Sequence, residues 1–243
     1  MTALGRLIPL ARRHGRPLCV MIPGAGGGLM PYLRVAAHLG DTYNVTAVRA
    51  AGLVPDEAPE ASVPKMAAGV LDALDADGLQ PDVVFGWSMG GTVAWEVCAD
   101  YAERGHHPDL VMVDCSPFRR PSDPEGDQEI LDLILGMLGP RPDPQTAQRV
   151  TATFEAHAVA LDTFATSRTY PGRVLLLVCA GRSDLDDRPG RAAALRRWRE
   201  LAPDLQVGSL EADHFRVFDP ERLPELTEHL GAFLRPARSE VAP

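Results

Sequence analysis

The sequence is nearly devoid of lysine, because Lys65 is the only lysine among its 24 basic residues. The 33 acidic residues outnumber the basic ones, and the resulting net charge of −9 argues against a nucleic-acid partner. Long apolar runs are also missing, so no segment is predicted to span a membrane. Residues 1–16 lack the apolar stretch and the cleavage site of a signal peptide. We therefore expect a cytoplasmic protein.

Cysteine is scarce as well, and its placement excludes further classes. None of the four cysteines forms a C-x-x-C pair, and each stands in an apolar run, which predicts reduced and mostly buried side chains. Neither a disulfide framework, a metal site nor a bound cofactor is expected. The four positions are Cys19, Cys98, Cys115 and Cys179.

Short buried-strand patterns alternate with amphipathic helical patterns along the chain. This alternation predicts one α/β domain around a largely parallel sheet flanked by helices. We expect a leading arm or linker over residues 1–16, the domain over 17–235 and a disordered tail over 236–243. Two apolar helical segments at about 118–168 interrupt the alternation. They are predicted to form a helical lid insertion above the strand ends, the alternative being an ordinary crossover.

The stretch from Asp82 to Glu96 carries the most specific motif. An apolar run leads into Gly-Trp-Ser-Met-Gly, which matches the G-x-S-x-G nucleophile elbow, and a helical pattern follows. Glycine at 86 and 90 avoids collisions within such a sharp turn. Ser88 is therefore the predicted nucleophile, placed at a helix N-terminus that favours a developing anion.

A serine nucleophile needs a base, and the base needs an acid to orient it. His214 follows directly from a predicted strand, unlike the other histidines after Ser88, and is the predicted base. Two aspartates are candidates for the acid: Asp114 ends the strand after the elbow strand, and Asp184 follows the next strand. The residues alone leave this choice open.

A second loop, Pro23 to Gly28, has hardly any side chains and exposes backbone N–H groups. Such a loop suits either a phosphate or the oxyanion of a reacting carbonyl. No lysine follows at P-loop spacing, and the next strand ends at Arg49 rather than at an acidic residue, which disfavours a dinucleotide site. With an elbow downstream, the oxyanion interpretation is the better one.

Together, these stretches resemble the type I thioesterase domains of nonribosomal peptide and polyketide synthases. The resemblance rests on Pro17 to Gly27, Gly86 to Gly91, Val113 to Pro117 and Asp213 to Phe215, and extends from about Arg6 to Leu234. It implies an α/β-hydrolase fold, and it favours Asp114 as the acid. It also implies an oxyanion hole formed by the N–H of Met89 and that of Gly24 or Ala25. One departure is Ile22 before Pro23, where the family often has histidine.

The resemblance further implies a substrate and a partner. The substrate would be an acyl or peptidyl chain held as a thioester on the phosphopantetheine of a carrier protein, released by hydrolysis or macrocyclisation through a Ser88 acyl-enzyme. A stand-alone editing (type II) thioesterase and a small-molecule carboxylesterase are the alternative enzymes. A catalytically silent hydrolase fold used for binding is the non-enzymatic alternative.

Overall fold

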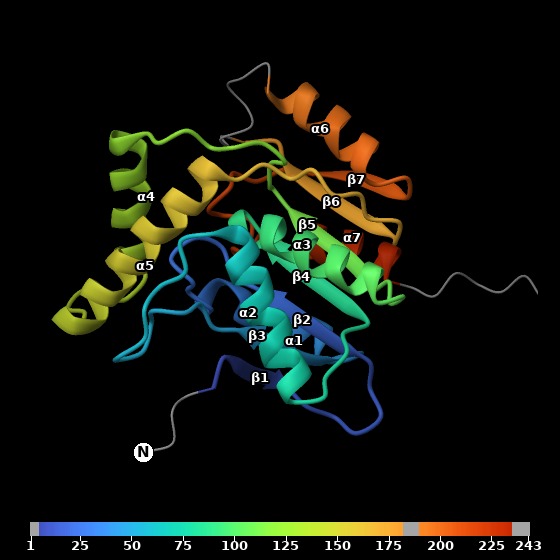
Figure 1. The fold of residues 1–243 in the computed structure, drawn as a ribbon, viewed down its shortest axis with the longest axis horizontal. Helices are drawn as coiled ribbons and strands as arrows, with labels where there is room; N and C mark the ends of the chain where they lie inside the picture. The colour runs from blue at the N-terminus through green and yellow to red at the C-terminus, as the bar shows by residue number, and fades with distance from the viewer. Residues whose placement is uncertain (1–4, 182–189, 235–243) are drawn as a thin grey trace, which may run out of the picture.

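A computed structural model describes residues 5–181 and 190–234 and shows one mixed sheet flanked by helices (Figure 1). The strand order is β1-β3-β2-β4-β5-β6-β7, and every neighbouring pair is parallel except β1 with β3. The predicted α/β class with a largely parallel sheet is confirmed. The strands are β1 (Leu7–Ala11), β2 (Leu18–Ile22), β3 (Asn44–Val48), β4 (Val83–Trp87), β5 (Asp109–Val113), β6 (Val174–Cys179) and β7 (Leu205–Leu210).

Helices cover both faces of the sheet and enclose two apolar cores. One core lies between the sheet and α2, α3 and α6, and the other between the sheet and α1 and α7. Strands β2, β4 and β6 are buried along their whole length, as expected for parallel strands covered on both faces. The helices are η1 (Met30–Tyr32, a 3-10 turn), α1 (Leu33–Leu39), α2 (Val63–Ala76), α3 (Met89–Glu103), α4 (Pro124–Gly136), α5 (Pro144–Thr163), α6 (Gly190–Leu201) and α7 (Leu223–Phe233).

The N-terminal segment differs from the expected leading arm over residues 1–16. Residues 7–11 form the edge strand β1, which pairs antiparallel with β3 and has a register irregularity between Pro9 and Ala11. Proline is tolerated there because an edge strand has one side free of ladder hydrogen bonds. The half-buried pattern of β1 gave no clear strand signal in the sequence. The expected tail, 236–243, lies outside the described residues.

Two helices separate β5 from β6 and lie together at one end of the sheet (Figure 1). We call these helices, α4 and α5 with their connection (residues 124–163), the insert. The apolar residues at 130–138 predict the first helix there, but the structure begins it at Pro124. Its first turns are polar and mostly exposed, so the sequence shows no apolar periodicity over them. The longest helix of the insert is α5, with 20 residues. Within the described ranges, no helix combines the length and apolar character needed to cross a bilayer.

Candidate active site

Ser88 stands in a strained turn between β4 and α3. Its backbone has φ +56° and ψ −130°, a region that non-glycine residues rarely adopt. The Ser88 N–H donates to the Val113 carbonyl at 2.9 Å, and the Gly91 N–H donates to the Ser88 carbonyl at 2.9 Å. Both hydrogen bonds hold the strained residue in place, as a nucleophile elbow requires.

The glycines of the motif are required by close backbone packing. A Cβ at Gly86 would collide with the backbone of Gly90, and a Cβ at Gly90 would collide with the carbonyl oxygen of Ile22. Any side chain at either position would therefore push β4, α3 and β2 apart. The sequence-based explanation for Gly86 and Gly90 agrees with these contacts.

The structure brings Asp114 and His214 into direct contact. His214 Nδ1 lies 2.7 Å from Asp114 Oδ2, although the two residues are 100 positions apart in the chain. The second carboxylate oxygen, Oδ1, accepts the Cys179 N–H at 3.0 Å. Asp114 follows β5 with φ +49°, and its side chain is almost completely buried. A carboxylate only accepts hydrogen bonds, so His214 donates from Nδ1 and its Nε2 is left for another partner.

Asp184, the other candidate acid, lies outside the described residues. Within the described ranges, no group of three or more His, Cys, Asp or Glu side chains is arranged to hold a metal ion. All four cysteines are buried free thiols.

Aromatic rings pack around His214, a feature that the sequence analysis missed. The Trp87 ring lies against the imidazole, with centroids 5.0 Å apart and an interplanar angle of 32°, and Phe215 contacts it edge-on at 4.9 Å. Trp87 is the variable residue of the elbow motif, so its position was known but its partner was not. These contacts limit the orientations that the imidazole can adopt.

The glycine-rich loop forms a tight turn beside the elbow. The Gly27 N–H donates to the Gly24 carbonyl at 3.1 Å, and Gly26 has φ +80°. The Gly24 N–H already donates to the hydroxyl of Tyr32 at 3.0 Å. Of the two expected donors, Ala25 therefore keeps its N–H for a ligand, since no hydrogen bond of this group is present among the described residues. Met89 is the first residue of α3, where the N–H has no partner within the helix.

His157 is a buried histidine within the stretch, about 118–168, where the sequence predicts the lid. It is 2% exposed and stands on α5, and its Nδ1 accepts the Gly26 N–H at 3.1 Å. Burial lowers the pKa of His157 to about 4, so the imidazole is neutral at physiological pH. Nothing in the sequence around residue 157 indicates a contact with a loop 131 positions earlier.

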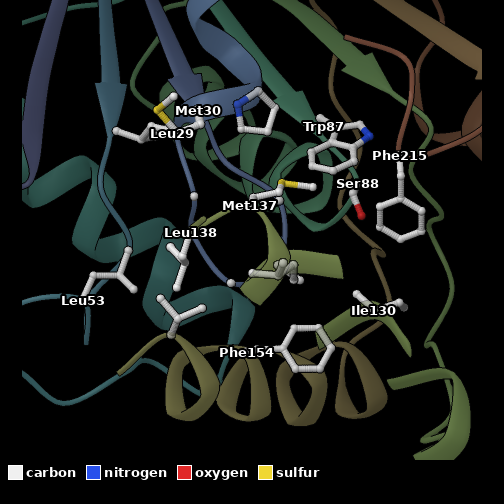
Figure 2. Close-up of a pocket in the computed structure, with 18 of the residues that line it drawn as sticks. Leu29, Met30, Leu53, Trp87, Ser88, Ile130, Met137, Leu138, Phe154 and Phe215 are labelled. Carbon is white, nitrogen blue, oxygen red and sulfur yellow. The ribbon is translucent and has the colours of Figure 1, made fainter. Parts of the chain in front are cut away.

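A cavity of about 410 Å³ opens next to Ser88, between the glycine-rich turn and the insert. Figure 2 shows the Ser88 side chain beside Trp87 and Phe215 at one wall, with Ile130 and Phe154 of the insert opposite. A smaller cavity of about 170 Å³ shares Ser88 and His214 with it. The lining of the larger cavity is mostly apolar and includes Leu29, Met30, Leu53, Ile134, Met137 and Leu138.

Similarity to known proteins extends over nearly the whole chain. The family model described as "Thioesterase domain" matches residues 16–234. Among curated proteins, thioesterase frbE of Dothideomycetidae sp. (strain 11243) is 24% identical over 262 residues, covering 93% of this chain and 91% of that protein.

Solved structures share the fold. The NocB thioesterase domain, in covalent complex with a fluorophosphonate nocardicin G analogue, is 25% identical with a TM-score of 0.74 and covers 94% of this chain and 99% of that one. YbtT, a type II thioesterase from the yersiniabactin NRPS/PKS pathway, is 21% identical with a TM-score of 0.69, covering 94% and 100%. These neighbours are thioesterases with α/β-hydrolase folds, from peptide and polyketide biosynthesis.

Proposed function

Since this chain belongs to the thioesterase domain family, we propose that it releases an apolar acyl or peptidyl chain from the phosphopantetheine thioester of a carrier protein. The proposal rests on one observation above all: the His214–Asp114 pair lies beside a serine in an elbow turn that opens into an apolar cavity. The catalytic triad is Ser88, His214 and Asp114. The carrier protein is the partner, and no cofactor of the protein's own is needed.

The reaction proceeds in two steps, acylation and deacylation of Ser88. In the first, Ser88 Oγ attacks the thioester carbonyl carbon and passes its proton to Nε2 of His214, while Asp114 stabilises the imidazolium. The carbon–sulfur bond then breaks, and the proton moves from His214 to the leaving phosphopantetheine thiolate. In the second, water or a hydroxyl or amine of the chain itself attacks the acyl-enzyme. His214 Nε2 takes the proton of this nucleophile, the ester bond between the acyl carbon and Ser88 Oγ breaks, and His214 returns the proton to Oγ.

The oxyanion of each tetrahedral intermediate is bound by the N–H groups of Met89 and Ala25. The N-terminus of α3 adds a favourable dipole at the same place. The insert covers the acyl chain and excludes water from the larger cavity, which is the role of a lid. Access of water relative to an internal nucleophile decides between a free acid and a ring.

The apolar lining of the cavity sets the preferred acyl chain. Each buried methylene contributes about 0.8 kcal/mol, so kcat/KM is expected to rise up to about fourfold per methylene until the cavity is full. A stand-alone editing thioesterase or a small-molecule carboxylesterase would use the same triad. Rates on the carrier-bound thioester and on a simple oxygen ester of the same acid separate the carboxylesterase from either thioesterase, since a carboxylesterase would prefer the simple ester.

Intact-mass spectrometry with a panel of C4 to C12 acyl thioesters of pantetheine and of a loaded carrier protein tests the proposal. The wild-type protein should gain the mass of one acyl group, and Ser88→Ala should gain none. Ser116→Ala is the matched control, because Ser116 lines the adjoining cavity and should leave the adduct intact. An acyl adduct that persists in Ser88→Ala would contradict the proposal.

A further inference from the structure

The turn from Gly24 to Gly27 presents its Ala25 N–H through a fixed backbone arrangement. The Gly24 carbonyl faces into the turn, where it accepts the Gly27 N–H. No peptide bond among the described residues is cis, so the Ala25 N–H in that same peptide points the opposite way, out of the turn. Gly26 has the positive φ that a type II turn gives its third residue.

The central peptide of this turn, between Ala25 and Gly26, is held by the insert. A peptide flip would convert a type II turn into a type I turn and would take the Gly26 N–H away from its partner. That partner is His157 Nδ1, at 3.1 Å, and the contact is buried. The imidazole can accept this hydrogen bond only while Nδ1 is unprotonated, which is the case in the neutral tautomer with the proton on Nε2.

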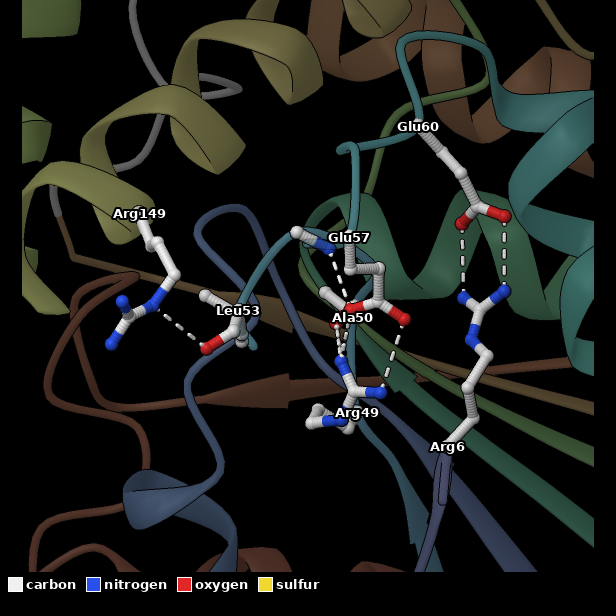
Figure 3. Close-up of polar contacts among 8 residues, drawn as sticks. Arg6, Arg49, Ala50, Leu53, Glu57, Glu60 and Arg149 are labelled. Atoms are coloured by element: carbon white, nitrogen blue, oxygen red, sulfur yellow. Dashed lines mark hydrogen bonds and ion pairs between the residues drawn. The ribbon is translucent and has the colours of Figure 1, made fainter. Parts of the chain in front are cut away.

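Further contacts join the insert to the same turn. A Cβ at Gly26 would lie 3.1 Å from Ile134 Cδ1 of α4, so this side chain packs directly on the turn. Leu53 packs on the turn as well, since a Cβ at Gly27 would lie 3.1 Å from Leu53 Cδ1. Figure 3 shows the Leu53 carbonyl accepting from Arg149 Nε of α5, at 3.3 Å.

We propose that His157 is a positioning residue. Through its hydrogen bond with the Gly26 N–H, the insert holds the turn from Gly24 to Gly27 in the conformation that directs the Ala25 N–H to the oxyanion, so Ala25 can act as a donor only while α5 is packed against this turn. This inference rests on the proposed thioesterase function and extends it: a helix outside the triad takes part in stabilising the transition state. His157 touches neither the nucleophile nor the leaving group and acts through the Gly26 N–H.

The matched pair His157→Asn and His157→Leu isolates the acceptor. The Asn amide oxygen stands as many bonds from Cα as His Nδ1, whereas Leu places a methyl group there at similar volume. Hydrolysis of octanoyl-pantetheine should fall on the order of 10- to 100-fold in kcat for His157→Leu, with KM changed less than about threefold, because a misplaced oxyanion donor weakens the transition state selectively. His157→Asn should recover most of kcat.

Octylboronic acid supplies a second readout, because its tetrahedral adduct on serine places a negative oxygen in the oxyanion hole. Its affinity should fall in His157→Leu by the same factor as kcat and recover in His157→Asn. Thr153→Val, a buried change one helical turn away on α5, is the control and should leave both values unchanged. If His157→Leu does not fold, His157→Gln replaces it, since its amide oxygen lies one bond too far out.

Equal kcat and boronate affinity in the Leu (or Gln) and Asn variants would overturn the inference while leaving the thioesterase proposal intact. A parallel loss of kcat in Thr153→Val would overturn it too, because the effect would then follow packing of α5 rather than the acceptor. A wild-type protein that turns over no thioester in the panel would contradict the proposed function, and this inference with it.

Discussion

Asp114 has a dedicated donor for each of its carboxylate oxygens, Cys179 N–H on Oδ1 and His214 on Oδ2. This arrangement fixes the carboxylate in one orientation and, through it, the tautomer of His214. The residue scale is also where the sequence was most informative. The elbow motif and the chain order were sufficient to select Ser88 and His214 as candidates and to reduce the acid to Asp114 or Asp184, of which the family resemblance favoured Asp114.

Asp114→Asn tests this arrangement, because an amide cannot accept on both sides. If its NH2 group faces the Cys179 N–H, two donors oppose each other. If it faces His214, Nδ1 must become the acceptor, which puts the proton on Nε2 and leaves no base for Ser88. We expect kcat to fall on the order of 10³- to 10⁴-fold, as when a triad acid is replaced by its amide. Asp184→Asn is the control, measured by the same thioester assay, and an equal loss in both variants would contradict the assignment of Asp114.

The contacts of three other residues near the site could not be predicted from the sequence. Tyr32 occupies the Gly24 N–H, Trp87 packs on the His214 ring and His157 binds Gly26. Each contact joins segments whose relative placement depends on the packing of whole helices against the sheet. Local periodicity reports burial but does not report the partner, so Gly24 and Ala25 could not be distinguished as donors from the sequence.

Helix α5 shows what a single element contributes beyond covering the sheet. It carries Thr153 and His157 four residues apart, and both are almost completely buried on the same side. His157 is hydrogen-bonded through Nδ1, whereas Thr153 Oγ1 has no hydrogen-bond partner among the described residues. Burial of an unpaired hydroxyl costs free energy that an apolar isostere would not.

Thr153→Val is therefore expected to stabilise the protein by about 1 kcal/mol and to raise Tm by about 2–4 °C. Thermal denaturation checks this expectation. Thr146→Val on the same helix provides the opposite case, because Thr146 Oγ1 donates to the capping residue Asp143 at 2.8 Å. That variant should be destabilised, and a lower Tm for Thr153→Val would show that its hydroxyl is satisfied in solution.

The elements themselves were predicted unevenly. The buried strand β2 was located to the residue, because a continuous apolar run bounded by turn residues marks it clearly. Edge strand β1 was missed, and α4 was predicted to begin six residues too late. Both errors have one cause: half-exposed segments follow no strict apolar pattern, and their structure depends on a neighbouring strand or helix.

At the scale of the whole molecule, a buried neutral histidine makes folding sensitive to acid. The pKa of His157 is lowered from 6.5 to about 4 by desolvation, so between these values the unfolded chain binds a proton that the folded chain does not. Stability therefore falls as pH decreases from about 6.5 to about 4 and then levels off for this group. Arg6 and Glu60 line a further small cavity that His157 also borders, and these two charged side chains are paired with each other.

His157 should account for a loss of up to about 3 kcal/mol of unfolding free energy across this pH range. Denaturant unfolding of the wild type and His157→Leu at several pH values isolates it, since the carboxylates contribute equally to both proteins. As pH falls, the free energy of unfolding of the wild type should decrease more than that of His157→Leu. A difference that stays constant from pH 7 to pH 4 would mean that His157 titrates alike in the folded and unfolded chains.

The hydrogen bond from Gly26 to α5 also bears on how such enzymes can be re-engineered. Exchanging the insert for that of a relative is an obvious route to a new acyl preference, because the insert forms one wall of the cavity. Residue 157 travels with the exchanged segment, whereas the turn that it orients stays with the recipient. Chimeras of this kind are expected to gain the new acyl preference but to have a lower kcat, unless residue 157 is restored to histidine.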